Sequence, residues 1–173
     1  AQAAAMGKPR LEGKPYRSSG GKMTYHPDLK REIPVGWTCA TLGEVFNLYQ
    51  PQTITEKDLK PNGDYFVYGA NGIVGKYDRF NHESPQIALT CRGSTCGNLT
   101  RTLPCSWITG NAMVMSPRNS NLDIEYIYNV AKNSGIDAII TGSGQPQITR
   151  ANLQDVKTIY PDSGTLTRYQ EFA

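Results

Sequence analysis

The chain of 173 residues has the length of one domain with a short remainder. Its formal net charge of +3 is too small to name a partner, and its 38% apolar content is enough for one ordinary core. The 17 glycines and 11 prolines predict frequent turns, and this composition excludes a collagen, a coiled coil and a fully disordered chain. A membrane-spanning helix is excluded as well, because no apolar run approaches ~20 residues.

The first 32 residues lack the pattern of a folded core. Residues 1–10 contain no Leu, Ile or Val that could form the apolar centre of an export signal, so we interpret them as a remnant of recombinant expression. Residues 11–32 are polar, basic and rich in Gly and Ser, which predicts an extended linker arm. Without an export signal, the protein is expected to be cytoplasmic and its thiols reduced. The spacing of the cysteines matches no zinc ribbon or finger, so we predict no metal site and keep one only as a minor alternative; the four are Cys39, Cys91, Cys96 and Cys105.

The folded body is expected to begin at Ile33, and its first part has the texture of β structure. Two aromatic and β-branched runs, 65–68 and 73–77, flank the turn signal Asn71-Gly72, which indicates a β-hairpin. Two further apolar runs typical of buried strands lie at residues 86–91 and 112–115.

The clearest helix is predicted over residues 122–133, where apolar side chains recur on one face. Asn121 or Asp123 can cap its first turn, and Gly135 is expected to end it. A main helix that follows a β-rich segment is typical of an α+β domain, and we expect the strands to form one curved mixed sheet.

The end of the chain predicts a closing helix–strand element. Thr149 can cap a short helix in which Leu153 packs inward, and residues 156–160 form a final strand. Residues 165–173 have the pattern of the first turns of another helix that the chain end cuts off. This pattern indicates a piece of a longer protein.

An active site is not apparent in the sequence. The two histidines, His26 and His82, lie in the arm and in an expected loop, and no nucleophile elbow or metal-ligand motif is present. Cys91 precedes Arg92 and could be a thiol activated by a cation, which leaves a remnant enzyme as one hypothesis. A cysteine that closes an apolar strand is, however, usually a small core residue. No catalytic residue and no cofactor are predicted.

Three Gly-rich segments, 68–72, 92–98 and 142–147, follow expected strands or precede an expected helix. Such loops can approach a phosphate backbone closely and offer polar side chains to base edges. Tight turns that need a positive φ also explain glycines in these positions, whatever the function. The polar residues within and beside the segments favour nucleic acid; they are Arg92, Asn98, Arg101, Gln145, Gln147 and Arg150.

Four segments, taken in order, resemble the DNA specificity subunits of type I restriction-modification systems. Residues 13–37 resemble the linker that enters the second half of such a subunit. Residues 41–45 (TLGEV) resemble its opening Leu-Gly-Glu/Asp element, and residues 87–98 (IALTCRGSTCGN) resemble its strand and Arg-Gly-x-x-x-Gly loop. Residues 143–156 (SGQPQITRANLQDV) resemble its closing Gln-Pro helix and strand.

The resemblance implies a DNA target recognition domain over residues 33–162, followed at 163–173 by the start of a conserved spacer helix. In that family, two such domains are held apart by two long helices, and each domain reads one half of a bipartite target. Modification subunits carry S-adenosylmethionine and the catalysis, and restriction subunits complete the complex. The chain itself is therefore expected to bind double-stranded DNA without catalysis or a cofactor of its own.

We expect the DNA-contacting residues to converge on one face of the domain. Arg can pair with guanine and Asn or Gln with adenine, whereas Lys76 is better suited to phosphate. The candidate residues are Asn71, Lys76, Arg92, Ser94, Thr95, Asn98, Arg101, Gln145, Gln147 and Arg150. A β-rich module that binds a small molecule or a carbohydrate is the alternative, suggested by ten tyrosines, two tryptophans and many polar loops.

Overall fold

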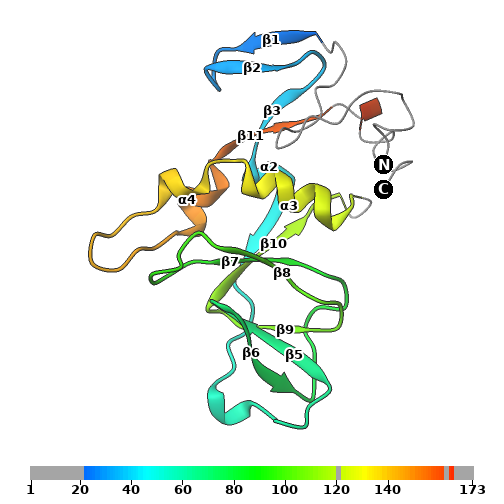
Figure 1. Ribbon diagram of the computed structural model, residues 1–173, viewed down its shortest axis with the longest axis vertical. Coiled ribbons are helices and arrows are strands. Elements are labelled where there is room, and N and C mark those ends of the chain that lie inside the picture. The colour runs from blue at the N-terminus through cyan, green and yellow to red at the C-terminus, as the bar shows by residue number, and fades with distance from the viewer. Residues whose placement is uncertain (1–21, 120–121, 162–163, 166–173) are drawn as a thin grey trace, which may run out of the picture. The chain divides into compact units, whose positions relative to one another are not determined.

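The computed structural model describes residues 22–119, 122–161 and 164–165 (Figure 1). The chain divides into two compact units, Ala1–Trp37 and Thr38–Ala173. The predicted start of a spacer helix over 163–173 lies mostly outside the described residues, as do the interpreted remnant 1–10 and the first half of the arm.

The first unit contains an antiparallel hairpin of β1 (Met23–His26) and β2 (Arg31–Pro34), with Thr24 opposite Ile33. Its turn begins at Pro27, whose carbonyl accepts a hydrogen bond from the Lys30 amide at 3.3 Å. The prediction of an extended arm missed this pairing. The reason is that the strands are short and mostly exposed, so no apolar alternation marks them.

The second unit is built on a four-stranded antiparallel sheet. Its strands, in spatial order, are β4 (Phe46–Tyr49), β10 (Ala112–Pro117), β7 (Ile87–Thr90) and β8 (Leu99–Arg101). The predicted strands at 86–91 and 112–115 are its two central members. Every residue of β7 is buried, which explains its continuous apolar run.

Two smaller sheets complete the unit. One has the order β6 (Gly72–Tyr77), β5 (Tyr65–Gly69), β9 (Trp107–Ile108), and the other pairs β11 (Lys157–Tyr160) with β3 (Thr38–Thr41). β5 and β6 form the hairpin predicted around Asn71-Gly72, and β11 is the predicted final strand. The α+β class is confirmed; the strands, which were expected in one curved mixed sheet, are divided among several short sheets. Among the named strands that the structure describes, only the pair β5–β9 is parallel.

The helices of the second unit are short. Among the elements that the structure bounds, they are α2 (Leu42–Val45), α3 (Ile124–Lys132) and α4 (Arg150–Gln154), with 3₁₀ turns η1 (Glu56–Asp58) and η2 (Ile136–Ile139). α3 is the helix predicted at 122–133. The Asp123 carboxylate caps it by accepting hydrogen bonds from the amides of Glu125 and Tyr126, and Gly135 follows it at φ 76°. α4 begins after the predicted cap, Thr149, and Leu153 is fully buried.

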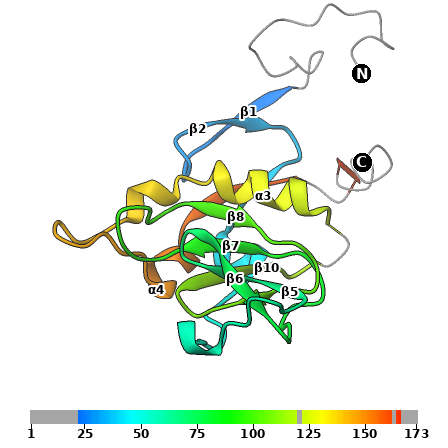
Figure 2. The ribbon, with the colours of Figure 1, turned by 60° about the horizontal axis from the view of Figure 1, so that its bottom comes forward.

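The four-stranded sheet is covered on both faces. Ile87 and Leu89 of β7 belong to the larger cluster, which includes Ile127 of α3 and Leu153 of α4. Ala88 of β7 points the other way, into a smaller cluster with residues of β5 and β9. Figures 1 and 2 both show α3 running beside β8. This double packing fixes the ends of β7 and β8, from which the candidate loops emerge.

Backbone pairing between the chain segments before β7 and after β8 continues beyond the two strands and includes the buried residue His82. His82 pairs with Ser106 by two backbone hydrogen bonds of 3.0 and 3.1 Å. Its Nε2 lies 2.8 Å from the Tyr49 hydroxyl, and its Nδ1 lies 2.6 Å from the Asn81 side-chain oxygen. Burial lowers the pKa of His82 below its ordinary value of 6.5. Neutral His82 therefore braces the end of the hairpin that is opposite the candidate loop.

Candidate nucleic-acid interface

The loop 92–98 connects β7 to β8, and both of its glycines have a positive φ. Gly93 has φ 87° and Gly97 has φ 97°, a region that residues with a Cβ rarely adopt. The loop is closed by hydrogen bonds from the Thr90 amide to the Asn98 carbonyl and from the Gly97 amide to the Thr90 carbonyl, both 2.9 Å. The side chains between these bonds are thereby carried at the end of a rigid hairpin.

The loop 141–147 lies directly against the loop 92–98. Thr141 and Gln147 exchange backbone hydrogen bonds of 3.0 and 2.8 Å, so this loop is closed on itself. The Gly93 amide donates to the Pro146 carbonyl at 3.0 Å, and Arg92 and Gln147 form an isolated β-bridge. Two Gly-rich segments that are about fifty residues apart in the sequence are therefore joined through their backbones.

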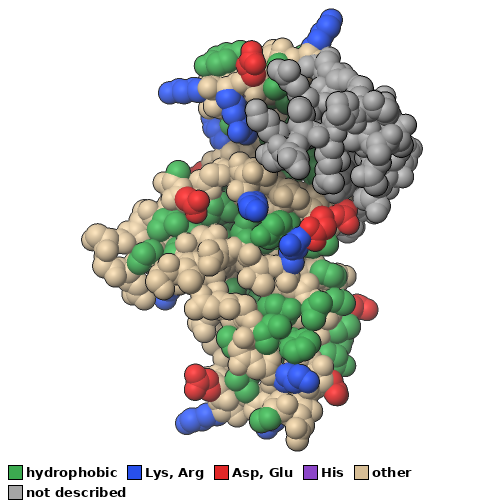
Figure 3. Space-filling model, in the orientation of Figure 1, with side chains coloured by type: hydrophobic (Ala, Val, Ile, Leu, Met, Phe, Trp, Pro, Cys, Tyr) green, Lys and Arg blue, Asp and Glu red, His purple; other side chains and the backbone are tan. Residues whose placement is uncertain are grey.

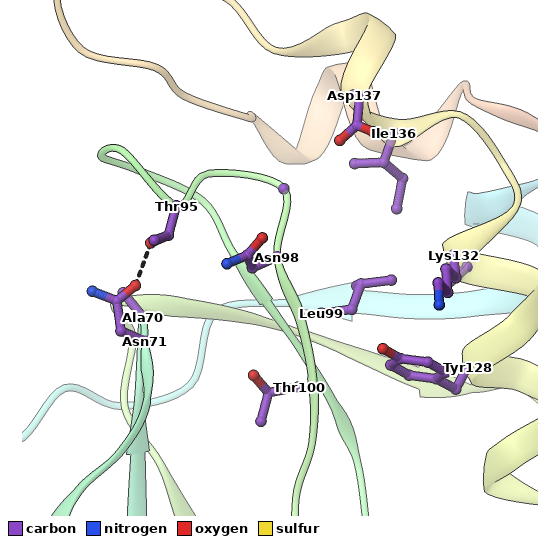
Figure 4. A pocket seen from close by; sticks show the side chains of 12 residues that line it. Ala70, Asn71, Thr95, Asn98, Leu99, Thr100, Tyr128, Lys132, Ile136 and Asp137 are labelled. Carbon is purple, nitrogen blue, oxygen red and sulfur yellow. Dashed lines mark hydrogen bonds between the residues drawn. The ribbon is translucent and has the colours of Figure 1, made fainter.

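The turn between β5 and β6 reaches the loop 92–98 from the other side. The Thr90 hydroxyl donates to the Ala70 carbonyl, and the Thr95 hydroxyl donates to the side-chain oxygen of Asn71. Figure 4 shows this second contact, with Asn71 and Thr95 pointing toward each other. We refer to the turn 70–71 and the loops 92–98 and 141–147 together as the loop surface.

Most of the predicted contact residues lie on the loop surface. Six of these side chains are exposed and Thr95 is half-buried; the seven are Asn71, Arg92, Ser94, Thr95, Asn98, Gln145 and Gln147. In Figure 3 the surface over the loop 141–147 is mostly backbone and uncharged polar side chains. For the Arg92 guanidinium, the described residues offer no hydrogen bond or ion pair.

Three predicted residues lie elsewhere. The Arg101 guanidinium pairs with the Glu125 carboxylate of α3 and stacks over the Tyr128 ring at 4.3 Å. Lys76 lies five residues beyond Asn71 on β6, roughly 16 Å along an extended strand, and its ammonium lies 5.5 Å from the Phe66 ring centroid. Arg150 is the first residue of α4.

The position of Arg150 follows from the helix start. Because Thr149 caps α4, the chain turns at this point, and Arg150 lines a hollow of about 110 Å³ with Arg118 and Gln154. The exposed Arg118 side chain also donates to the Gly43 carbonyl at 2.9 Å. Arg118 is a cation near this hollow that the sequence analysis did not single out.

A cavity of about 520 Å³ lies between the loop surface and the helical segment formed by α3 and η2 (Figure 4). Asn71, Thr95 and Asn98 line one side, and Lys132 and Asp137 line the other. Sequence reasoning missed the second side because those residues belong to a helix end with no motif of its own. Because Lys132 and Asp137 carry opposite charges, the cavity suits a neutral polar ligand better than a polyanion.

The described thiols do not support a cysteine-based active site. Cys91 is 2% exposed, and burial raises the pKa of its thiol to about 11. The adjacent Arg92 is exposed and lowers this pKa less than burial raises it. Across the described ranges, no group of three or more His, Cys, Asp or Glu side chains is arranged to hold a metal ion. Nor does any described helix have the length and apolarity to cross a membrane.

The fold and the sequence match one family. Residues 34–167 match the type I restriction modification DNA specificity domain, so the chain belongs to that family. A Mycoplasma pneumoniae protein described as a type I specificity subunit, S.MpnORF638P, is 25% identical over 134 residues, which is 75% of this chain and 36% of that protein.

Solved structures show the same fold. The S subunit of the type I restriction-modification system from M. genitalium superposes with a TM-score of 0.66 at 19% identity, covering 79% of this chain and 37% of that one. The HsdS subunit from Thermoanaerobacter tengcongensis gives a TM-score of 0.59 at 17% identity, covering 85% and 38%. The chain therefore spans little more than a third of the relatives that it matches.

Proposed function

We propose that this chain reads one half of a bipartite DNA target for a type I restriction-modification complex and performs no catalysis itself. The observation that carries the proposal is the loop surface. Three Gly-rich segments, widely spaced in the sequence, are joined by backbone and side-chain hydrogen bonds and present amides and a guanidinium to solvent. Membership in the DNA specificity domain family supports the same function.

The side chains suit base edges better than they suit phosphates. Arg92 matches the two acceptors of guanine in the major groove, and the side-chain amides of Asn98 and Gln147 match the acceptor–donor pair of adenine. Lys76, at the other end of the β5–β6 hairpin, is assigned to a phosphate. Asn71, Ser94 and Gln145 complete the base-facing set. Arg101 and Arg150 are assigned to the margin of the DNA interface. Arg101 contacts DNA there only if a phosphate replaces Glu125 as the partner of its guanidinium.

The surrounding complex follows from the same proposal. The recognition domain covers residues 33–162, and residues 163–173 begin a spacer helix. Modification subunits supply S-adenosylmethionine and methyl transfer, restriction subunits supply cleavage, and the assembly works in the cytoplasm. Because residues 37–173 carry a net charge of −1, non-specific attraction to DNA is weak, and isolated binding is modest and lost at moderate salt.

The experiment compares Arg92→Ala with Lys76→Ala in the protein assembled with modification subunits. Selection from a pool of randomised duplexes first identifies the target half-site. Arg92→Ala should relax discrimination at one base pair by about 5- to 150-fold. Lys76→Ala should weaken all duplexes alike and reduce the salt slope by roughly one. If neither variant changes affinity or specificity, the loop surface is not the DNA interface. Selective binding to a glycan panel by a complex that selects no duplex would favour the carbohydrate-binding alternative.

A further inference from the structure

We propose that Thr95 is a positioning residue for DNA recognition, which acts by holding the Asn71 amide in one orientation rather than by touching DNA. The inference rests on the proposed function, because it assigns a cause to the selectivity of one contact on the loop surface. The juxtaposition that carries it is a half-buried hydroxyl on the loop 92–98 against an exposed amide at the tip of the β5–β6 hairpin.

The tip of that hairpin is held by the loop that it faces. Thr90 holds the Ala70 carbonyl and Thr95 holds the Asn71 side chain, so backbone and side chain of the tip are both attached to the β7–β8 hairpin. Gly72, at φ 91°, makes the turn tight. Asn71 therefore has little freedom of its own apart from the rotation of its side chain, and the Thr95 hydroxyl restricts that rotation.

The hydrogen bond also decides which part of the amide faces outward. The Asn71 oxygen accepts from Thr95, so the amide nitrogen keeps both of its protons for a ligand. A fixed N–H donor suits an acceptor on a base edge, such as N7 of a purine. Because the amide is oriented before DNA arrives, less conformational entropy is lost on binding.

The position of Thr95 argues against a direct contact with DNA. Its side chain is half-buried, whereas its neighbour Ser94 and its partner Asn71 are exposed. The Thr95 hydroxyl proton is already donated to Asn71, so it is not available to a base. A residue of this kind influences a base only through the group that it holds.

A double-mutant cycle on the assembled complex tests the inference, with the selected duplex and its single mismatches as probes. Asn71→Ala should lower discrimination at one base pair by about 5- to 150-fold. Thr95→Val keeps the shape but removes the hydroxyl, and should lower discrimination at the same base pair by about 3- to 10-fold. Thr95→Ser should restore it. In the Asn71→Ala background, Thr95→Val should have no further effect.

Two further variants sharpen the result. Asn71→Asp can still accept from Thr95 but has no N–H to donate, so it should lose discrimination as Asn71→Ala does. Thr100→Val is the matched control, because it makes the same change on the same hairpin at a hydroxyl with no hydrogen-bond partner among the described residues. It should discriminate like the parent protein.

The possible failures point to different claims. If the parent complex selects no duplex, the proposed function is wrong and this inference falls with it. If it selects a duplex and Thr95→Val discriminates like the parent, the proposed function stands and Thr95 is not a positioning residue. If Thr95→Val still weakens discrimination in the Asn71→Ala background, Thr95 contacts DNA itself and the inference is overturned. Thermal melting of each variant identifies any loss that is due to unfolding.

Discussion

The two ends of the β7–β8 hairpin carry arginines in opposite situations. At the loop end, Arg92 is exposed and the described residues give its guanidinium no ionic partner. At the other end, where the two strands are not joined (the open end), Arg101 is also exposed but is paired with Glu125 and stacked on Tyr128. Both belong to one short hairpin and are nine residues apart. The difference arises from α3, which lies beside β8 and supplies both partners of Arg101.

The comparison shows what makes a cation available to a ligand. A charge that is already neutralised must break its ion pair before it can meet a phosphate, whereas an unpaired guanidinium loses only water. The loop end of the hairpin therefore carries a cation without an ionic partner among the described residues, whereas the cation of the open end attaches α3. Three experiments test this division, in order of decreasing expected effect.

The largest effect is expected from the attachment of α3. Ile127 is fully buried on the inner face of this helix, so Ile127→Ala should reduce the free energy of unfolding by about 2–5 kcal/mol. Ile73 on β6 is 52% exposed, and Ile73→Ala should stay within about 0.5 kcal/mol of the parent. Urea denaturation of both variants measures the difference. Equal losses would mean that α3 does not anchor the open end.

An intermediate effect separates the two arginines. Arg101→Ala should lower the free energy of unfolding by about 1–2 kcal/mol, from an exposed ion pair and a cation–π contact, while changing discrimination by less than about threefold. Arg92→Ala should do the reverse, with little change in stability and a large loss of discrimination. Denaturation and mismatch-binding measurements on the same preparations give both quantities. Interchanged results would assign the reading role to the open end.

The smallest effect concerns pH at the open end. Because burial lowers the pKa of His82, the unfolded chain takes up a proton at a higher pH than the folded one. The contribution of His82 to the free energy of unfolding should therefore be fully present above pH 6.5 and should be lost as the pH falls from 6.5 toward the lowered pKa. Subtracting the curve of His82→Gln from that of the parent isolates this contribution. Hydrogen bonds from Thr41 and Thr55 lower the pKa values of Glu44 and Asp58. These carboxylates therefore lose their contributions to stability only when the pH falls below 4.5 and 3.8, respectively.

Local signals predicted most of the elements of the second unit. The Asn71-Gly72 turn, the Asp123 cap of α3 and the Thr149 cap of α4 each act within a few residues, so the sequence shows them directly. The division into several sheets was not predictable in this way, because it depends on pairings such as β5 with β9, about forty residues apart. The β1–β2 hairpin was missed because its strands are short and Ile33 is their one buried residue, so no apolar alternation marks them.

The candidate site was predictable in composition but not in geometry. The glycines and amides of the loop surface are visible in the sequence, and the structure brings most of them together. Arg101 looked the same as Arg92 in the sequence, since Glu125 and Tyr128 are more than twenty residues away. The far side of the cavity, with Lys132 and Asp137, carries no local signal at all.

The closure of the loop 141–147 on itself has a consequence for how such domains diverge. Because Thr141 and Gln147 are paired, the chain leaves the body of the domain and returns to it at a single point. Insertions between Gly142 and Pro146 leave the span to be bridged unchanged, and lengthening such a loop costs little free energy. Under the proposed function, this segment is therefore the part of the loop surface that can change in length without any change to the sheet that supports it.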